Sequence, residues 1–459
     1  MSQVQKLAAF KAYDIRGRMP DQLNEFMVYC IGKAYAQVMQ PQAPIAIGQD
    51  IRLSSKALSQ ALIAGLNAEG VQTIDIGLCG TEMIYFAAGQ EGMGGGIMVT
   101  ASHNPADYNG LKMVKEGSRP ISADTGLGAI EQQTIALMQA QSAPNSYIPN
   151  AALHTEKSVL AGYIAKLLSL IDVASIKPLH VLVNAGNGCA GPFFDALAQH
   201  LPLKVTRLHH QPDGTFPNDV PNPMLVEQQV LTAKAVVDAK ADFGIAWDGD
   251  FDRCFFYDEN GRFIEGYYLV GLLAEQLLKK SPKSAIVHDP RLEWNTIEKV
   301  QTLGGKAVVC KCGHSFIKDK MREQDAVYGG EMSAHHYFRD FFYCDSGMIP
   351  WLLVAELLSQ DGRSLSQVVD QCMMDFPCSG EINFTIANAK EALVRVQAYY
   401  AEQAISIDYL DGVSMEFADW RFNLRSSNTE PVVRLNVETR ANSALLATKV
   451  AELKGLLVG

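Results

Sequence analysis

Short apolar runs that end in turn residues alternate along most of the chain with longer segments of helical period. The run PIAIGQD (residues 44–50) is typical of a buried strand, because its apolar positions are nearly contiguous and Asp50 ends it. Ser54 or Ser55 can cap the helix that follows, which carries a leucine at every fourth position. Because strands and helices alternate in this way, the pattern predicts parallel sheets with helical crossovers.

Two distant parts of the chain show the same order of features. Asp50-Ile51-Arg52-Leu53 follows one predicted strand, and Asp289-Pro290-Arg291-Leu292 follows another. Further along, one strand runs into Thr100-Ala101-Ser102-His103, and its counterpart runs into Glu331-Met332-Ser333-Ala334-His335. The spacings between these features drift by several residues, so the repeat is a duplication of whole domains and not a solenoid.

The rest of the chain completes a plan of four domains. The middle part has a strand and glycine-rich turn at 179–188 and a strand at 241–247, whereas the part after about residue 370 has alternating strands and a terminal helix. We expect three related mixed α/β sandwich domains and a smaller C-terminal α+β domain around a central cleft, since open α/β sheets bind ligands where their strands end. The expected boundaries are 1–150, 151–255, 256–368 and 369–459.

The composition restricts the class of protein and its partners. The 459 residues are 48% hydrophobic with a net charge of −11, so several cores can form and neither nucleic acid nor an anionic membrane is the expected partner. The nine scattered cysteines favour reduced thiols, and Cys310 and Cys312 lack a second pair at zinc spacing. No signal peptide and no run of about 18 apolar residues occurs, which predicts a cytoplasmic protein, either a monomer or a homodimer.

The first loop with candidate chemistry is Thr100-Ala101-Ser102-His103-Asn104-Pro105. A serine at the end of a strand can act as a nucleophile when a base or a charge activates it. His103 is adjacent, but consecutive residues need not face each other. A polar turn closed by Asn-Pro is the structural alternative.

Asp248, Asp250 and Asp252 alternate in the second loop, directly after an apolar strand. Three carboxylates are costly to place together without a cation, and hard oxygen ligands suit Mg²⁺. The apolar residues on both sides argue against a solvated acidic turn. A calcium-binding EF-hand fits less well, because Arg253 stands where that loop needs glycine and the flanks have the pattern of strands.

Two later loops carry groups that suit a phosphorylated sugar. Glu331, Ser333 and His335 alternate, so an extended segment would place them on one face, where a carboxylate and a hydroxyl suit sugar hydroxyls. Residues 425–431 (RSSNTEP) combine a guanidinium group, hydroxyls and an amide that can cradle a phosphate. Taken alone, each loop is also compatible with an ordinary polar turn or a structural histidine pair.

In their order along the chain, these segments resemble the α-D-phosphohexomutase superfamily over essentially the whole length. The motifs are TASHNP, DGDFDR, GEMSAHH and RSSNTEP, preceded by AYDIRG at residues 12–17. One motif alone is suggestive, whereas all five in this order are highly specific. The resemblance implies a phosphoserine at Ser102, and Mg²⁺ held by Asp248, Asp250, Asp252 and a phosphoserine oxygen.

The resemblance also implies roles for individual residues. The residues expected in phosphoryl transfer are Ser102, His103, Lys112, Arg253 and His314, of which either Lys112 or His314 is the expected acid or base. The residues expected to bind substrate are Tyr13, Arg16, Arg291, Glu331, Ser333, His335, Arg425, Ser427, Asn428, Thr429 and Arg434. Related enzymes often carry a lysine near the position of Arg291, so Arg291 is expected to supply that positive charge.

The implied reaction exchanges mannose 6-phosphate and mannose 1-phosphate through the phosphoserine and a hexose 1,6-bisphosphate, which also serves as activator. The sequence leaves open whether the enzyme is instead a phosphoglucomutase or a dual-specificity phosphohexomutase. Mannose and glucose differ at carbon 2, and no residue of the sequence is clearly identified as the one that recognises this position. A phosphatase and a non-catalytic sensor of sugar phosphates are rival functions. The phosphate-binding loop disfavours the phosphatase, and Ser102 with the complete acidic loop disfavours the sensor.

Overall fold

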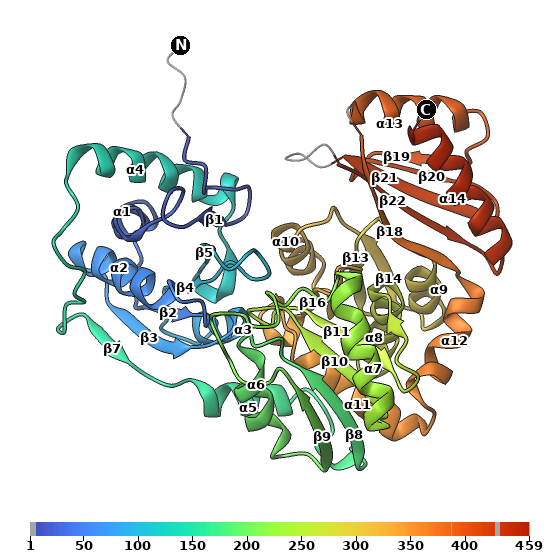
Figure 1. The fold of residues 1–459 in the computed structure, drawn as a ribbon, viewed down its shortest axis with the longest axis horizontal. Helices are drawn as coiled ribbons and strands as arrows, with labels where there is room; N and C mark the ends of the chain where they lie inside the picture. The colour runs from blue at the N-terminus through green and yellow to red at the C-terminus, as the bar shows by residue number, and fades with distance from the viewer. Residues whose placement is uncertain (1–5, 387, 427–431, 459) are drawn as a thin grey trace. The chain divides into compact units, whose positions relative to one another are not determined.

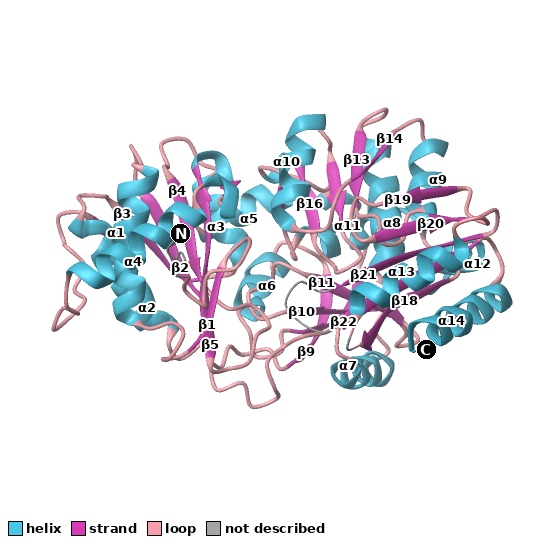
Figure 2. Cartoon of the chain, turned by 90° about the horizontal axis from the view of Figure 1, so that it is seen from above, coloured by secondary structure: helices cyan, strands magenta, loops and turns pink. Residues whose placement is uncertain are grey.

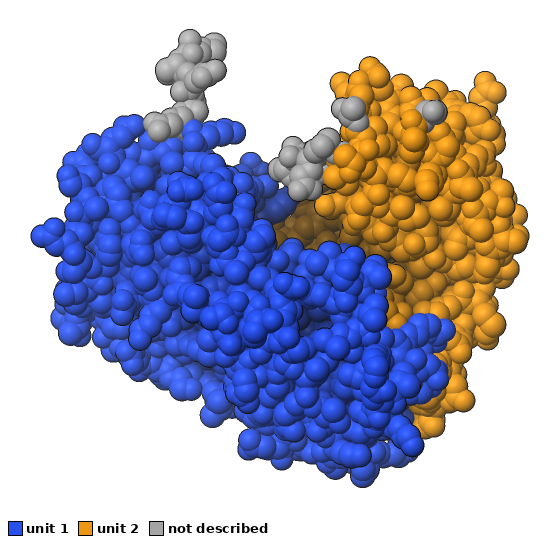
Figure 3. Space-filling model, viewed as in Figure 1, with its two compact units in different colours: residues 1–262, 340–360 blue, residues 263–339, 361–459 orange. Residues whose placement is uncertain are grey.

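The computed structural model of the chain describes residues 6–386, 388–426 and 432–458. The chain divides into two compact units, of which the first is residues 1–262 with 340–360 and the second is residues 263–339 with 361–459 (Figure 3). None of the helices among the described residues is long and apolar enough to cross a membrane.

The first sheet lies in the amino-terminal part of unit 1 (Figure 1). Its strand order is β1-β5-β4-β2-β3-β7, with β6 paired to β5, and the pairs that involve β5 are antiparallel while β4, β2, β3 and β7 run parallel. The strands are β1 (Ile15–Arg18), β2 (Ile45–Gln49), β3 (Thr73–Leu78), β4 (Gly95–Val99), β5 (Tyr108–Lys115), β6 (Arg119–Pro120) and β7 (His154–Glu156). The helices are α1 (Glu25–Met39), α2 (Ser55–Ala68), α3 (Thr81–Ala88) and α4 (Leu127–Ala140).

The helices of this domain pack closely because their contacting positions are small. A Cβ atom on Gly32 of α1 would lie 2.5 Å from the carbonyl oxygen of Leu62, and one on Gly65 of α2 would lie 2.2 Å from that of Tyr29. The aliphatic residues of α1, α2 and the strands close one hydrophobic core around this contact. The core leaves the carboxyl ends of β2 and β4 available for the polar loops that follow them.

Within unit 1, the strands of the second sheet follow the order β11-β10-β8-β9, in which β10, β8 and β9 are parallel and β11 is antiparallel to β10. Its strands are β8 (Leu179–Asn184), β9 (Leu203–Leu208), β10 (Phe243–Trp247) and β11 (Cys254–Asp258). The helices of this part are α5 (Leu160–Leu168), α6 (Ala190–Ala198), α7 (Val226–Ala239) and α11 (Ile349–Asp361), and β17 is Cys344–Asp345. Phe194 of α6 packs against Trp351 of α11 with ring centroids 5.0 Å apart, so the late segment 340–360 completes this core.

Within unit 2, the strands of the third sheet follow the order β14-β13-β15-β16, with β16 antiparallel to β15. Its strands in this unit are β13 (Ala285–His288), β14 (Lys306–Val309), β15 (Tyr328–Gly330) and β16 (His336–Phe338). The two-residue strand β12 (Phe263–Ile264) is not part of this sheet. The helices are α8 (Gly266–Lys280), α9 (Trp294–Thr302), α10 (His314–Gln324) and α12 (Leu365–Asp375). Short 3₁₀ helices occupy Glu116–Ser118, Ala123–Thr125, Val173–Ser175 and Arg339–Phe341.

The last part of unit 2 is an antiparallel sheet of order β18-β22-β21-β20-β19, with α13 and α14 packed on it (Figure 2). Its elements are β18 (Cys378–Thr385), α13 (Ala389–Tyr400), β19 (Ser406–Asp408), β20 (Val413–Glu416), β21 (Trp420–Ser426), β22 (Val432–Thr439) and α14 (Ser443–Val458). The sequence prediction of three α/β domains followed by an α+β domain is thus confirmed.

Candidate functional site

Ser102 lies in a strained turn directly after β4. Its backbone is left-handed, with a φ of 50°, which is unusual for a residue with a side chain and marks a functional candidate. The Oγ atom donates a hydrogen bond to Asp248 Oδ2 at 2.7 Å and lies 3.1 Å from His103 Nδ1. The side chain is 2% exposed. The structure therefore brings the predicted nucleophile into contact with the first residue of the acidic loop.

Arg52 holds the backbone of the Ser102 turn. Its guanidinium group donates to four carbonyl oxygens, those of Ser102 (2.8 Å), Asn104 (2.6 Å), Pro105 (2.6 Å) and Tyr108 (2.9 Å). Arg52 is 3% exposed and its Nε lies 3.3 Å from Asp50 Oδ2. In the sequence, Arg52 stands out only as part of a repeat, which indicates no role at the site.

The three aspartates of the second loop form a buried cluster. Ligand oxygens of Asp248, Asp250 and Asp252 all lie within 4.8 Å of one another. Burial raises the pKa of Asp248 to about 6, against the opposing charge of Arg253. The Oδ1 atom of Asp250 is buried and has no hydrogen-bond partner among the described residues. Three buried carboxylates, one of which has an unused acceptor atom in Asp250, are suited to a divalent cation.

Two basic residues neutralise this cluster. Lys112 Nζ, from β5, lies 2.7 Å from Asp250 Oδ2 and 2.5 Å from Asp252 Oδ2. Arg253 donates to Asp248 Oδ2 through Nε at 2.9 Å and through Nη2 at 2.8 Å. Although burial opposes it, the charge of Asp250 raises the pKa of Lys112, so the lysine is held as a cation.

The serine loop and the acidic loop touch at their backbones. A Cβ atom on Gly249 would lie 2.6 Å from the carbonyl oxygen of Ser102, so only glycine fits between Asp248 and Asp250. Thr81, at the start of α3, donates its hydroxyl to Asp250 Oδ2 at 2.5 Å. The close approach explains how residues 146 positions apart share one hydrogen bond.

The remaining predicted residues of unit 1 lie beside this centre. Arg16 donates to Asn104 Oδ1 at 2.7 Å, in the serine loop, and pairs with Asp14 at 2.7 Å. His103 Nδ1 accepts from Arg253 Nη2 at 2.5 Å, which identifies it as a neutral imidazole. Burial, with the charge of Arg253, also holds the pKa of His103 well below its usual range. Tyr13 is half-buried just before β1.

In unit 2, Glu331, Ser333 and His335 follow β15 and lie close together. Ser333 Oγ and His335 Nδ1 are 3.4 Å apart, and His335 Nδ1 is 3.7 Å from Glu331 Oε2. The prediction that an extended segment presents them was wrong. The backbone forms a tight turn, in which the N–H of Glu331 donates to the carbonyl oxygen of His335 and the N–H of Ala334 donates to that of Glu331. Ala334 is left-handed at a φ of 67°.

Glu331 and Arg291 are anchored by surrounding groups. Glu331 accepts from the backbone N–H of Gly313 at 3.0 Å and from the hydroxyl of Tyr337 at 2.6 Å. Arg291 Nη2 donates to Asp289 Oδ2 at 2.6 Å and to Ser333 Oγ at 3.2 Å. His314, the other candidate acid or base, is the first residue of α10.

The repeat seen in the sequence reappears in the geometry. The backbone N–H of Arg52 donates to Asp50 Oδ1 at 3.0 Å, and that of Arg291 donates to Asp289 Oδ1 at the same distance. In the first domain the arginine binds the loop after β4, and in the third it binds the loop after β15. The duplicated turn therefore performs the same structural task twice.

Arg425 and Arg434 lie opposite each other on β21 and β22. Both contact Glu381 of β18, Arg425 through Nη2 at 2.7 Å and Arg434 through Nε at 3.8 Å. Ser427, Asn428 and Thr429, which sequence analysis predicted to bind phosphate, lie outside the described residues. The sequence did not single out Glu381, which lies within β18, because no local motif marks its contact with these two arginines.

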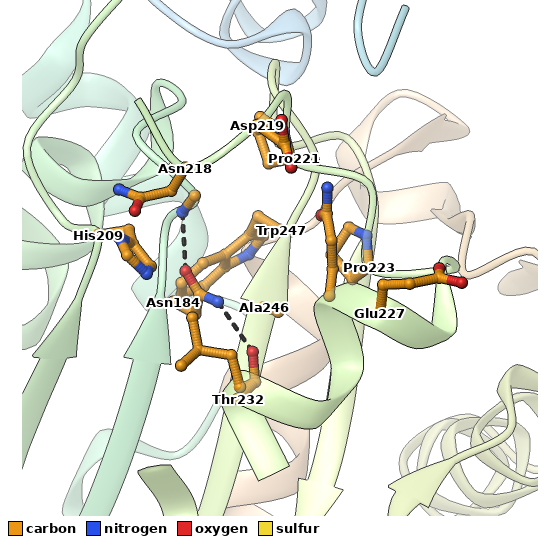
Figure 4. Close-up of a pocket in the computed structure, with 13 residues that line it drawn as sticks. Asn184, His209, Asn218, Asp219, Pro221, Pro223, Glu227, Thr232, Ala246 and Trp247 are labelled. Carbon is orange, nitrogen blue, oxygen red and sulfur yellow. Dashed lines mark hydrogen bonds between the residues drawn. The ribbon is translucent and has the colours of Figure 1, made fainter. Parts of the chain in front are cut away.

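A separate cavity of about 250 Å³ opens in unit 1 at the carboxyl ends of β8 and β10 (Figure 4). Its lining includes Asn184, which donates to the Thr232 hydroxyl at 2.8 Å, and the acidic residues Asp219 and Glu227. It has no lysine or arginine among the described residues of its lining. The cavity therefore lacks the cations that a phosphate needs, and the clusters described above suit a phosphosugar better.

Four domain families match the chain in order, all described as phosphoglucomutase/phosphomannomutase. The alpha/beta/alpha domains I, II and III match residues 7–141, 161–261 and 265–376, and the C-terminal domain matches residues 381–455. The matches cover most of the chain and include both units.

Named relatives and a solved structure agree with these matches. A protein of Xanthomonas campestris pv. campestris named "Phosphohexose mutases" is 59% identical over 99% of this chain and 100% of the relative. A phosphomannomutase of Salmonella montevideo is 54% identical over 98% of this chain and 99% of the relative. The crystal structure of a phosphoglucomutase/phosphomannomutase family protein from Burkholderia thailandensis has a TM-score of 0.85 at 30% identity, covering 98% of this chain and 96% of that one.

Fold, site and relatives together define an enzyme that isomerises phosphosugars by moving a phosphoryl group. The chain belongs to the phosphoglucomutase/phosphomannomutase family. Enzymes of this family depend on a metal ion, and the buried cluster of Asp248, Asp250 and Asp252 suits one.

Proposed function

We propose that the chain is a phosphomannomutase that interconverts mannose 6-phosphate and mannose 1-phosphate through a phosphoserine at Ser102. The observation that carries the proposal is the contact between the strained Ser102 and the buried acidic cluster, at 2.7 Å from Asp248. The names of relatives at high identity over nearly the full length support the same activity. A phosphoglucomutase or dual-specificity enzyme is the nearest alternative, since no contact described above reads carbon 2 of the sugar.

Each half-reaction moves one phosphoryl group between Ser102 and the sugar. The bond between phosphorus and Ser102 Oγ breaks, a bond to a sugar hydroxyl oxygen forms, and the hydroxyl proton passes to a base. The product is a hexose 1,6-bisphosphate, which returns its other phosphoryl group to Ser102 after turning round. Such a transfer depends mainly on in-line positioning and charge neutralisation.

The residues of unit 1 supply that charge in the proposed mechanism. Arg253, fixed on Asp248, and Lys112 neutralise the phosphoryl oxygens, and the neutral His103 contacts Ser102 Oγ. Mg²⁺, held by the three aspartates and a phosphoserine oxygen, would withdraw negative charge from the transferred group. We assign the acid or base to Lys112 or His314, and the pH profiles of Lys112→Ala and His314→Ala would distinguish them.

The residues of unit 2 bind the substrate in this proposal. Glu331 and Ser333 hold sugar hydroxyls, with His335 beside them, and Arg291 supplies a cation next to Ser333. Arg425 and Arg434 bind the phosphate that is not reacting, together with Ser427, Asn428 and Thr429. In unit 1, Tyr13 and Arg16 contact the substrate beside the serine loop. Hexose 1,6-bisphosphate serves as activator because it rephosphorylates Ser102.

The proposal also assigns a role to each of the four domains and a cellular location to the enzyme. Residues 1–150 carry the phosphoserine, 151–255 the metal ligands, 256–368 the sugar-binding loop and 369–459 the phosphate-binding loop. The nine cysteines are free thiols, which is consistent with a reducing compartment such as the cytoplasm.

A coupled assay of the purified chain tests the proposal. Mannose 1-phosphate and glucose 1-phosphate are compared with Mg²⁺ and a trace of hexose 1,6-bisphosphate, and free phosphate is followed in parallel. We expect conversion to the 6-phosphates without release of phosphate, with the higher kcat/KM for the mannose substrate. Release of phosphate without isomerisation would mean a phosphatase, and a higher kcat/KM for glucose 1-phosphate would mean a phosphoglucomutase.

A further inference from the structure

Glu381 sits among three guanidinium groups in unit 2. Its Oε2 lies 2.7 Å from Arg425 Nη2 and 3.7 Å from Arg291 Nη1, and its Oε1 lies 3.8 Å from Arg434 Nε. Arg425 and Arg434 are directly opposite residues of an antiparallel pair. Like charges at such positions repel each other, so the carboxylate of Glu381 offsets their repulsion.

The arginines keep donor capacity that Glu381 does not use. The Nε atoms of Arg291, Arg425 and Arg434 are all buried, and none has a hydrogen-bond partner among the described residues. The only other carboxylate near Arg425 in the described structure is Asp411, whose Oδ2 lies 3.6 Å from Nη1. A group with several acceptor oxygens, such as a phosphate, fits these unused donors.

The carboxylate of Glu381 is itself charged and close to where such a phosphate would bind. Burial alone would favour its neutral form, but the charges of Arg291 and Arg425 hold the pKa of Glu381 below its usual value. An incoming phosphate dianion must therefore either displace this carboxylate from Arg425 or bind beside it against its charge. Either way, Glu381 weakens phosphate binding.

We propose that Glu381 is a positioning residue that acts as an internal counter-ion: it orders Arg425 and Arg434 and limits how tightly they hold the substrate's non-reacting phosphate. This inference rests on the proposed mutase function. In that function Arg425 and Arg434 must let go of one phosphate of the bisphosphate, so that the sugar can turn round and present this phosphate to Ser102. Binding that is equally tight in every state lowers KM without raising kcat, and here it would slow the exchange of the two phosphates.

Binding of inorganic phosphate tests the counter-ion without any turnover. With the full-length chain, Glu381→Gln removes the charge but keeps an acceptor beside Arg425, and we expect the Kd for phosphate to fall at least about fivefold at low salt. Glu323→Gln is the matched control, because Glu323 is exposed and its pair with Lys320 on α10 contributes little. Arg425→Ala identifies the site. In the presence of this substitution, chains with and without Glu381→Gln should have the same Kd for phosphate.

Kinetics with mannose 1-phosphate test the link to turnover. In Glu381→Gln we expect KM and kcat to fall together. If the variant only lost the ordering of Arg425 and Arg434, KM would rise instead. Glu381→Asp, which keeps the charge but withdraws it from Arg425, serves as a second variant with an intermediate Kd in case the amide variant folds poorly. An unchanged or weaker affinity for phosphate in both variants would overturn the counter-ion, and tighter binding with an unchanged kcat would overturn its role in reorientation. If the proposed function itself fails, the unmutated chain will show no isomerisation, and the phosphate titration remains a separate result.

Discussion

At the scale of single residues, Ser102 is the position on which the chemistry depends. Ser102→Ala removes the Oγ atom that contacts Asp248 and His103 but leaves the four bonds from Arg52 to the loop carbonyls, since only one involves the Ser102 backbone and none its side chain. We expect mutase activity to fall by at least about 10³-fold while the thermal unfolding midpoint stays close to that of the unmutated chain. Ser169→Ala, at an exposed serine, is the control. Near-normal activity in Ser102→Ala would remove this residue as the phosphoryl carrier.

Sequence could identify Ser102 and the three aspartates because their chemistry is concentrated in short, ordered motifs. It could not identify Arg52 or Glu381, because their roles come from partners that are far away in the chain. Arg52 contacts the loop carbonyls only after β2 and β4 pair, and Glu381 meets Arg425 only after β18, β22 and β21 assemble. A lone arginine or glutamate in the sequence carries no signal of such a contact.

Arg52→Met should disturb the Ser102 loop directly. Four carbonyl oxygens lose a charged donor at once, so we expect the free energy of unfolding to fall by about 3 kcal/mol or more. We also expect the single-turnover rate of phosphoryl transfer from hexose 1,6-bisphosphate to Ser102 to fall more than phosphate affinity does. Arg52→Lys should rescue only part of either loss, because an ammonium group cannot reproduce the fork geometry. Transfer at the normal rate in Arg52→Met would show that the loop keeps its shape without the arginine.

At the scale of elements, the ends of strands were easier to predict than the shapes of the loops after them. The loops after β4, β10 and β15 carry the predicted chemistry, as the rule for open α/β sheets requires. The loop at 331–335 is a tight turn because Ala334 adopts a left-handed conformation. Alanine gives no sequence signal for that conformation, so an extended segment was the natural but wrong prediction.

Glu82 of α3 joins three elements of unit 1 through one buried carboxyl group. It accepts bonds from the hydroxyls of Tyr163 and Ser346 and from the backbone N–H groups of Gly347 and Met348. Burial raises the pKa of Glu82 to about 8, from an ordinary value of 4.5 for a solvated glutamate. The folded state therefore binds more protons than the unfolded state between these two values. The stabilising contribution is complete below pH 4.5 and is lost as the pH rises through 8.

Glu82→Gln should remove this pH dependence. We expect the free energy of unfolding of the unmutated chain to decline between about pH 5 and pH 8 by up to about 1.4 kcal/mol per pH unit more than that of the variant. Urea unfolding at several pH values measures the difference. The amide nitrogen cannot accept a hydrogen bond, whereas both oxygens of the protonated carboxyl can, so the variant should also be less stable at about pH 5. Parallel pH profiles for the two proteins would mean that Glu82 is already ionised in the folded state at the acidic end of this range.

At the scale of the whole molecule, the buried acidic cluster links stability to the metal. Asp248, Asp250 and Asp252 keep three carboxylates in one buried site, where Lys112 and Arg253 provide two opposing charges. A ligand that binds only the folded state stabilises it by an amount that grows with ligand concentration. We expect Mg²⁺ to raise the thermal unfolding midpoint and to restore activity removed by EDTA. The chain has a net charge of −11, so Ca²⁺ and spermidine are needed as controls for general screening.

Asp250→Asn separates specific binding from screening. It removes the carboxylate whose Oδ1 has no hydrogen-bond partner among the described residues, so the Mg²⁺ concentration for half-maximal stabilisation should rise at least about tenfold. Because the variant also relieves repulsion among the carboxylates, its midpoint without Mg²⁺ should equal or exceed that of the unmutated chain. Asp238→Asn is a matched control, since Asp238 is exposed on α7 and pairs with Lys234. If Asp250→Asn responds to Mg²⁺ as the unmutated chain does, the metal binds elsewhere. In that case Lys112 and Arg253 alone would have to neutralise the acidic loop.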